Sequence, residues 1–234
     1  MGERAILIEF DAEIKEDLLY KLLFYKNLIQ KKYFKEKVEV TNTYASLLIF
    51  YHSIIEDVYS EVLAIKLLLD AANIIKKPAI DIFHIPVCYD SKFGLDLDLI
   101  SQSKNIEVDE IITLHTAPVY TVYFIGFLPG FLYLGGLDER LQISRKSSPR
   151  NRVDKGAVGI GENQTGIYPK SSPGGWQIIG NSPIEIFDKN SIPPCRISAG
   201  DKIKFYPVSR EEYEEIKTDV SKGKFQLIST AYDS

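Results

Sequence analysis

The chain has 234 residues, and hydrophobic residues make up 45% of it, a composition typical of a globular protein with a sizeable core. Its formal net charge of −4 and pI near 5.5 give it no general attraction for nucleic acid, so we expect no nucleic-acid partner. The longest apolar run, residues 119–134, is shorter than a membrane-spanning helix and contains glycine and proline, so we expect no membrane partner.

Composition also bears on the compartment and on metals. The chain has two cysteines, and its beginning includes Glu3, Arg4 and Glu9 rather than an apolar leader, so we expect a reducing, cytoplasmic setting. The three histidines are far apart in the sequence, which predicts no metal site. The sequence lacks the phosphate-binding pattern G-x4-G-K-[ST] and the zinc pattern H-E-x-x-H.

The first third of the chain alternates strand and helix patterns. Leu18, Leu22 and Tyr25, at spacings of four and three, lie on one stripe of an amphipathic helix. We predict helices over residues 13–31 and 54–76 and strands over residues 4–10, 37–41, 44–52 and 79–87. The order β-α-β-β-α-β is that of a ferredoxin-like split βαβ domain, which we place at residues 1–88.

The remainder, residues 89–234, has a different pattern. Two short helices lead to His115, and an aromatic and β-branched run at residues 120–125 predicts a central strand. Short strands separated by glycine, proline and asparagine recur beyond it, which is typical of a sandwich or a small barrel. A surface helix over residues 210–217 follows. The sequence therefore predicts an α+β protein whose second domain consists mainly of strands.

Six sequence blocks between residues 114 and 183 contain most of the glycines. They are His115 with Tyr120 and Val122, then GFLPGFLYLGGL at 126–137, PRNRV at 149–153, VGI at 158–160, QTGIYP at 164–169 and SPGGWQIIG at 172–180. One such block is a weak signal, because Gly-Pro turns are common between strands, whereas six in order over about seventy residues are specific. In these blocks the chain closely resembles the 5-oxoprolinase B-subunit family, also called KipI or allophanate hydrolase subunit 1.

This resemblance implies both a fold and an activity. The fold would be a ferredoxin-like domain, residues 1–88, followed by a cyclophilin-like β-barrel, residues 89–234. The activity would be that of the B subunit of an ATP-dependent 5-oxoprolinase, a hydrolase that acts with C and A subunits to open the cyclic amide 5-oxo-L-proline to L-glutamate. ATP would be a co-substrate that acts with Mg²⁺, and we expect no bound prosthetic group.

Two other functions are open. Some relatives are described as inhibitors of a sensor histidine kinase, so the chain could be a binding module. The older family name points instead to a subunit of an allophanate or urea amide hydrolase. Retention by a kinase bait without any oxoprolinase partner would support the first, and substrate-depletion assays on the assembled complex would separate the second from 5-oxoprolinase.

Three arginines are candidates for the chemistry. Arg150 and Arg152 point to the same face of an extended chain, and Arg145 lies just before them. A guanidinium binds carboxylate or phosphate in a bidentate way, and phosphorylation of a lactam oxygen requires cations around developing negative charge. We expect Arg145 and Arg150 to be catalytic and to lie exposed beside the Pro149 turn, and Arg152 to bind substrate. The alternative is a solvated basic loop.

His115 is a further catalytic candidate, for proton transfer. The alternative is a histidine that bonds to backbone at a junction between a helix and a strand. Trp176 is expected to be a packing anchor, because an indole offers a large area to bury and needs a single hydrogen-bond partner.

The remaining candidates would bind substrate. Glycines let a loop press its backbone against a ligand. Amide, hydroxyl and ammonium groups could donate to a carbonyl or phosphoryl oxygen, although Tyr168 could instead fill the barrel. We expect contacts from the loop residues Gly126, Phe127, Pro129 and Gly130 and from Gln164, Tyr168 and Lys170.

Overall fold

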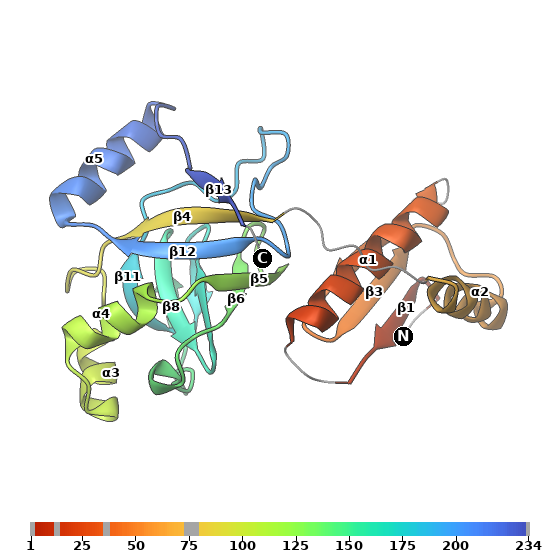
Figure 1. The fold of residues 1–234 in the computed structure, drawn as a ribbon, viewed down its shortest axis with the longest axis horizontal. Helices are drawn as coiled ribbons and strands as arrows, with labels where there is room; N and C mark the ends of the chain where they lie inside the picture. Colours follow the sequence, from red (N-terminus) through yellow and green to blue (C-terminus); the bar gives the residue numbers. More distant parts are fainter. Residues whose placement is uncertain (1–2, 12–14, 35–37, 73–79, 233–234) are drawn as a thin grey trace. The chain divides into compact units, whose positions relative to one another are not determined.

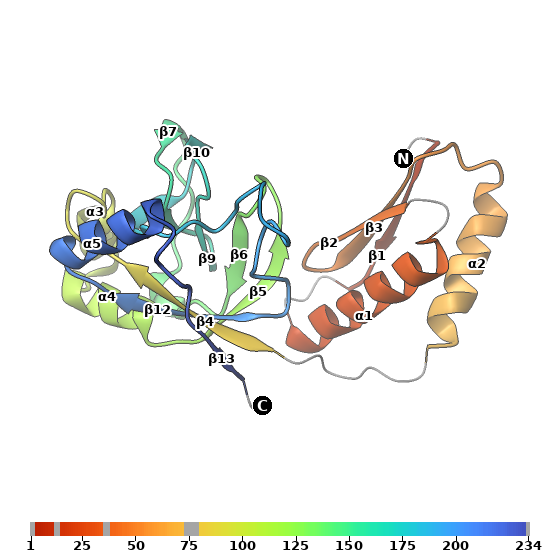
Figure 2. The same ribbon diagram turned by 90° about the horizontal axis from the view of Figure 1, so that it is seen from above.

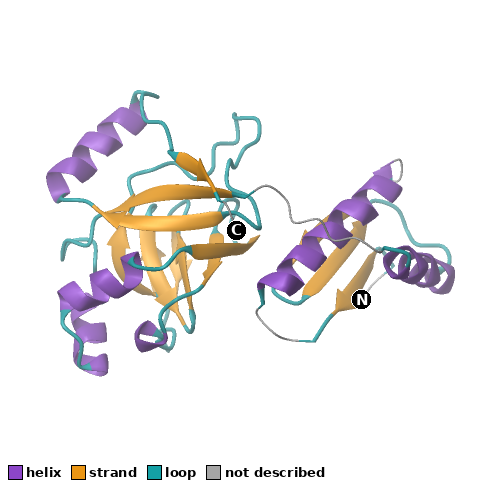
Figure 3. Cartoon of the chain, in the orientation of Figure 1, coloured by secondary structure: helices purple, strands orange, loops and turns teal. Residues whose placement is uncertain are grey.

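The computed structural model describes residues 3–11, 15–34, 38–72 and 80–232. The chain divides into two compact units, Met1–Pro78 and Ala79–Ser234, and each combines helices with strands (Figure 3). Each unit has a hydrophobic core of its own. The predicted α+β class is confirmed at this level.

In its described residues, the first unit consists of a three-stranded sheet and two helices (Figure 1). Its elements are β1 (Ala5–Glu9), α1 (Glu16–Lys32), β2 (Val38–Asn42), β3 (Ser46–Tyr51) and α2 (Val58–Asp70). The strand order is β1-β3-β2, and both pairs are antiparallel. Leu22 and Ile29 of α1 pack with Leu47 and Ile49 of β3, and all four are fully buried. These helices and strands confirm the order predicted for this part of the chain.

Helix α2 begins at Val58 rather than at residue 54 because of Asp57. The Asp57 side chain accepts hydrogen bonds from the backbone N–H groups of Tyr59 (3.0 Å) and Ser60 (3.1 Å). These donors have no partner inside the helix, so the cap fixes its first turn. The predicted end of this helix, residues 73–76, lies outside the described residues.

The strand predicted to complete the first domain pairs instead in the second unit. It is β4 (Asp81–Val87), which runs parallel to β12 (Lys202–Pro207) and antiparallel to β13 (Ser229–Ala231). We predicted a boundary near residue 88, and the division into compact units falls at residue 78. A strand pattern shows that a segment fits a sheet, but it does not identify the partner strand.

The second unit is built around an eight-stranded sheet with the order β11-β8-β9-β6-β5-β12-β4-β13. Its other strands are β5 (Tyr120–Ile125), β6 (Leu132–Gly135), β8 (Ala157–Gly161), β9 (Gln164–Ile167) and β11 (Gln177–Asn181). Strands β7 (Arg150–Val153) and β10 (Ser172–Gly174) form a separate antiparallel pair on the side of β9, away from β4 and β12 (Figure 2).

The sheet closes on itself at a single bridge, which we call the seam. Cys88 follows β4 and Asn181 ends β11, and these two residues exchange two backbone hydrogen bonds of 2.9 and 3.0 Å. The Asn181 side chain accepts a hydrogen bond from the Tyr213 hydroxyl (2.9 Å) and donates one to the backbone oxygen of Lys155 (3.0 Å). This bridge joins the end of β4 to β11, while β13 remains at the other edge of β4.

Because side chains alternate across a strand, the barrel has an inner and an outer apolar set. On β8, Val158 and Ile160 belong to the inner core, whereas Ala157 belongs to a second group. We call this group the outer cluster; its buried members are Phe131, Val153, Ala157, Tyr168, Trp176 and Ile178. Val153 comes from β7, so the β7–β10 pair helps to cover the outer cluster.

Among the described residues, the second unit also has three α-helices, α3 (Leu97–Lys104), α4 (Val108–Thr116) and α5 (Arg210–Ser221), and a short 3-10 helix, η2 (Glu139–Leu141). Helix α5 begins with a capping box, in which Ser209 and Glu212 each accept a backbone hydrogen bond from the other. This confirms the helix predicted over 210–217, which continues to Ser221. None of the helices in the described ranges combines the length and apolar character needed to cross a membrane.

Candidate functional site

The outer cluster rests on a floor of glycines. A Cβ atom added at Gly161 would lie 2.7 Å from the indole of Trp176, and one added at Gly166 would lie 3.0 Å from the same ring. Any side chain at these positions of β8 and β9 would therefore displace the tryptophan. Gly161, which directly follows the VGI block, and Gly166 of the QTGIYP block let Trp176 lie directly on the barrel wall, where it is 4% exposed. The predicted packing role of Trp176 agrees with this burial.

Phe131 connects the cluster to the loop between β5 and β6. Its ring meets Tyr168 edge-on at a centroid distance of 5.1 Å and Trp176 at 5.4 Å. It also contacts Phe127 at 5.7 Å, and Phe127 itself is largely exposed with a φ of +65°. Of the predicted loop contacts, Phe127 and Pro129 lie at the surface, Gly126 is partly exposed and Gly130 is buried. The loop therefore presents an aromatic ring and a proline beside the cluster.

Arg145 is the cation that faces the outer cluster. Its guanidinium lies 5.6 Å from the centre of the Trp176 ring, and its side chain is exposed. Arg145 belongs to residues 144–150, which we call the site loop. Two hydrogen bonds fix the backbone of this loop: the Lys146 N–H donates to the Gly175 oxygen (2.7 Å), and the side-chain amide of Gln177 donates to the Ser144 oxygen (3.1 Å).

Arg150 is not the exposed rim residue that we predicted. Its side chain is 23% exposed, and Nη2 donates to Oδ1 of Asp96 at 2.7 Å. Nη1 is buried and finds no hydrogen-bond partner among the described residues. Lys146 Nζ reaches the same carboxylate oxygen at 3.3 Å. Two cations of the site loop thus bind one buried carboxylate. Arg145, which is close to both in the sequence, instead places its guanidinium over the Trp176 ring.

Asp96 is a residue that sequence reasoning missed. Its side chain is 3% exposed, and its other oxygen, Oδ2, accepts from the backbone N–H of Ile178 at 2.6 Å. Burial acts to raise the pKa of Asp96, but the hydrogen bonds from Arg150 and Ile178 and the positive charges of Arg150 and Lys146 outweigh it, so the pKa is lowered. In the sequence Asp96 resembles a helix cap before α3, yet its side chain makes no cap hydrogen bond.

His115 lies inside the barrel, on the other side of the sheet from Arg145. It is fully buried, and its ring stacks on Phe205 at a centroid distance of 4.8 Å. Nδ1 lies 2.7 Å from the Tyr89 hydroxyl, and Nε2 lies 2.9 Å from Oγ1 of Thr165. The structure therefore does not bring His115 together with the arginines.

These contacts fix the proton on the His115 ring. The Thr165 hydroxyl donates its single proton to the Gly159 oxygen (3.0 Å), so it can accept from Nε2–H of His115. Nδ1 is then the acceptor for the Tyr89 hydroxyl. Burial lowers the pKa of His115 to about 3, so the imidazole is neutral at physiological pH. This geometry favours the alternative role, a structural histidine next to the junction of α4 and β5.

The other predicted contacts are scattered. Arg152 pairs with Asp154 at 2.9 Å, and both are well exposed. Lys170 is exposed, whereas Tyr168 is 2% exposed and fills the outer cluster. The side-chain oxygen of Gln164 is buried and has no hydrogen-bond partner within the described part of the chain. Burial raises the pKa of Tyr168, so its hydroxyl stays protonated.

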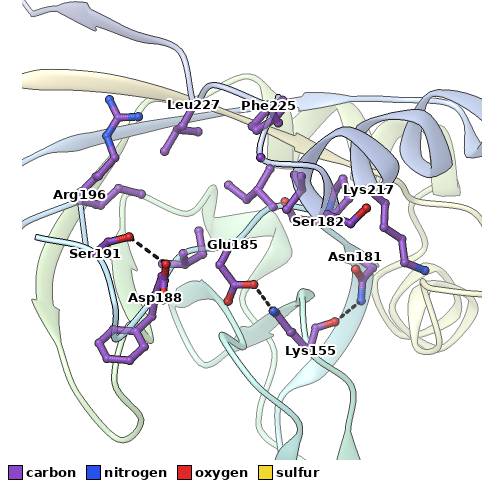
Figure 4. A pocket seen from close by; sticks show the side chains of 18 of the residues that line it. Lys155, Asn181, Ser182, Glu185, Asp188, Ser191, Arg196, Lys217, Phe225 and Leu227 are labelled. Carbon is purple, nitrogen blue, oxygen red and sulfur yellow. Dashed lines mark hydrogen bonds and ion pairs between the residues drawn. The ribbon is translucent and has the colours of Figure 1, made fainter. Parts of the chain in front are cut away.

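A pocket of about 1400 Å³ lies elsewhere in the second unit (Figure 4). It is lined by residues 181–194, Arg196 and Ile197, by α5 and by Phe225 and Leu227, and Lys155 pairs with Glu185 on its wall. None of the predicted site residues lines it. Within the described ranges, no three side chains of histidine, cysteine, aspartate or glutamate gather as a metal site.

Sequence comparison relates nearly the whole chain to characterised families. Residues 1–197 match the family model "Carboxyltransferase domain, subdomain C and D". The chain is 35% identical over 231 residues to the 5-oxoprolinase B subunit of Bacillus subtilis, an alignment that covers 94% of this chain and 95% of that protein. It is 50% identical over 122 residues to the 5-oxoprolinase B subunit of Haemophilus influenzae, covering 52% and 57%.

This chain is also similar to parts of longer proteins. Urea amidolyase of Saccharomyces cerevisiae is 30% identical over 144 residues, which cover 56% of this chain and 8% of the yeast protein. The crystal structure of Kluyveromyces lactis urea carboxylase superposes with a TM-score of 0.83 over 99% of this chain at 22% identity, a likeness of fold. This chain spans 23% of that urea carboxylase chain.

Proposed function

We propose that this chain, which belongs to the 5-oxoprolinase B-subunit family, is the B subunit of a complex that opens 5-oxo-L-proline to L-glutamate with hydrolysis of ATP. The observation that carries the proposal is the 35% identity to a 5-oxoprolinase B subunit along 94% of this chain and 95% of that relative. The C and A subunits are the proposed partners. The two cysteines are free thiols, which suits the cytoplasmic location that we propose for the complex.

We also propose the finer fold assignment. The order β1-β3-β2 of the first unit agrees with the first three strands of a ferredoxin-like sheet. The closed sheet of the second unit, with its seam at Cys88 and Asn181, supports a cyclophilin-like barrel.

Arg145 is the residue that we assign to the anionic part of the reaction. The substrate carries a carboxylate beside its lactam ring, and attack on the activated lactam places negative charge on oxygen. An exposed guanidinium held over an aromatic wall can meet either group. A positioned donor of this kind contributes about 10²- to 10³-fold to the rate when the charge that it meets develops in the transition state. Arg150 and Lys146 then hold the site loop rather than the substrate.

The residues around the outer cluster suit Mg²⁺ and ATP less well than they suit the anionic substrate. Mg²⁺ with nucleotide phosphates is held by carboxylates and water, and the described residues do not gather carboxylates at the outer cluster. The acid nearest the site loop, Asp96, is already engaged by two cations and a backbone N–H. We therefore assign no step that involves ATP or Mg²⁺ to residues of this chain.

The test is reconstitution. The purified chain alone should not open 5-oxoproline, and mixing it with its C and A partners should give ATP-dependent release of glutamate. Glutamate release by the chain alone would contradict the assignment as one subunit of a larger enzyme. No turnover by a correctly assembled complex, with each component folded, would contradict the substrate.

The second candidate is a urea-related amide hydrolase, which the similarity to urea amidolyase favours. The assembled complex would then deplete urea or allophanate and leave 5-oxoproline untouched. Inhibition of a sensor histidine kinase stays a prediction from the resemblance, and a kinase pull-down tests it.

A further inference from the structure

We propose that Asp96 is a positioning residue for an anion site formed by Arg145. By binding Lys146 and Arg150 together, it holds the site loop in the conformation that places the Arg145 guanidinium over Trp176. The inference deepens the proposed function, because the anion would be the carboxylate of the substrate or a phosphoryl group of the reaction.

Asp96 joins three segments that are distant in the sequence. Its backbone N–H donates to the Ile178 oxygen at 2.8 Å, and its Oδ2 accepts from the Ile178 N–H at 2.6 Å. Strand β11 therefore fixes both the backbone and the side chain of Asp96. Its Oδ1 is left to face the site loop, where it accepts from Arg150 and Lys146. A rigidly held carboxylate is therefore the fixed point to which the loop is attached.

The charges explain why an acid is needed here. Lys146 and Arg150 both approach Oδ1, so their positive charges repel each other unless a negative charge lies between them. A buried cation that loses its partner also loses its compensation for lost hydration. An amide at position 96 would keep the shape and some hydrogen bonds but would leave both cations uncompensated, and we expect the loop to move.

Arg145 is the residue that would register this movement. It stands next to Lys146, and its own side chain makes no ion pair with the described residues. Its position over Trp176 depends on the loop backbone. Hydrogen bonds to Gly175 and from Gln177 hold this backbone at Lys146 and Ser144. The ion pairs with Asp96 hold the loop through the side chains of Lys146 and Arg150. Loss of Asp96 should therefore reduce anion binding without removing any atom of the anion site.

Trp176 supplies the measurement. It is the single tryptophan of the chain, so its fluorescence reports on this site without a label. The full-length chain is titrated in separate arms with 5-oxoproline, which carries a carboxylate, and with inorganic phosphate. A response to the first alone identifies a carboxylate site, and a response to the second alone identifies a phosphoryl site; either supports the inference.

The variants are Asp96→Asn and Arg145→Ala, with Asp98→Asn as the matched control. Asp98 lies two residues away in the first turn of α3 and is exposed. We expect wild type and Asp98→Asn to bind alike, and Asp96→Asn and Arg145→Ala to bind at least about tenfold more weakly, a loss of the size expected for one charged contact. In the double variant Asp96→Asn with Arg145→Ala, the loss should equal that of Arg145→Ala alone.

Three results would overturn the inference. The first is wild-type affinity in Asp96→Asn. The second is a double variant whose losses add, because Asp96 would then act on the whole fold rather than through Arg145. The third is a wild-type chain that responds to neither anion. If Asp96→Asn fails to fold, Lys146→Ala is used in its place. Lys146 is less buried than Asp96, and its substitution removes one of the two ion pairs that anchor the loop. The titration does not depend on turnover, so an inactive complex would count against the 5-oxoprolinase assignment and not against this site.

Discussion

Replacing Arg150 with alanine should destabilise the second unit far more than replacing Arg145. The Arg150 side chain is 23% exposed, and the Asp96 side chain that it binds is 3% exposed. Removing one partner of a buried ion pair costs about 3 to 5 kcal/mol, and because Lys146 and the Ile178 N–H remain, we expect the lower end, about 3 kcal/mol. Arg145 makes an exposed cation–π contact worth about 0.5 to 1 kcal/mol.

The difference should be visible in melting temperature. For a unit of this size, each kcal/mol lowers the melting temperature by about 2 to 4 °C, so Arg150→Ala should melt about 6 to 12 °C below wild type. Asp96 has a folded pKa below its ordinary value of 3.8, so its contribution is present above that pH and is lost as the pH falls through the folded pKa. The gap between wild type and Arg150→Ala should therefore narrow in acid below pH 3.8.

Calorimetric melting of the full-length chain over a pH series measures both effects, with Arg145→Ala as the matched control. If Arg150→Ala and Arg145→Ala melt together with wild type, the ion pair with Asp96 adds nothing to stability. The assignment of Arg150 to loop support would then be refuted.

Four further outcomes are expected. Arg145→Ala should lower glutamate release by the reconstituted complex about 10²-fold at an almost unchanged melting temperature, and Arg145→Lys should rescue poorly because an ammonium lacks the planar fork; near-normal turnover would remove Arg145 from the site. Because the pKa of His115 is depressed in the folded state, its contribution to the free energy of unfolding should be intact above pH 6.5 and fall by at most about 1.4 kcal/mol per pH unit between pH 6.5 and 3. The melting temperature of a His115→Gln variant should therefore depend less on pH over that range. Gly161→Ala should cost about 1 to 3 kcal/mol and shift the emission of Trp176, since the new methyl group meets the indole; unchanged emission would contradict the glycine floor. A chain of residues 79–234 should fold alone, because its core is closed within that unit, and aggregation under all conditions would argue for a core shared with the rest.

The sequence predicted local structure better than strand partners. Helices α1 and α2 follow from apolar residues at helical spacing, and α5 lies where the sequence predicted a surface helix. The strand predicted over 79–87 is present as β4 (Asp81–Val87), but it pairs with β12 and β13 rather than with the strands of the first unit. Its pairing with β12 depends on residues more than a hundred positions away, and no local pattern encodes that distance.

The site was predicted in the same uneven way. The glycines and aromatics of the outer cluster stand in contiguous blocks, so their grouping could be recognised from sequence. Asp96 could not be recognised, because its partners lie 50, 54 and 82 residues away and its position before α3 resembles a cap. His115 has a residue type that suits catalysis, and burial inside the barrel is a tertiary property that residue type does not reveal.

The pairing of β4 with β12 and β13 has a consequence for how the chain is made. The first strand of the second unit finds its partners in the last strands, so the barrel cannot close until residues 202–231 have left the ribosome. Contacts of such long sequence separation slow folding, since loop entropy must be lost before they form. During synthesis, the edges of β4 and β5 that will pair with β12 stay unpaired until β12 has been made, and unpaired strand edges are prone to aggregation. A chaperone that shields exposed strand edges would therefore matter more for the folding of this unit than for that of the first.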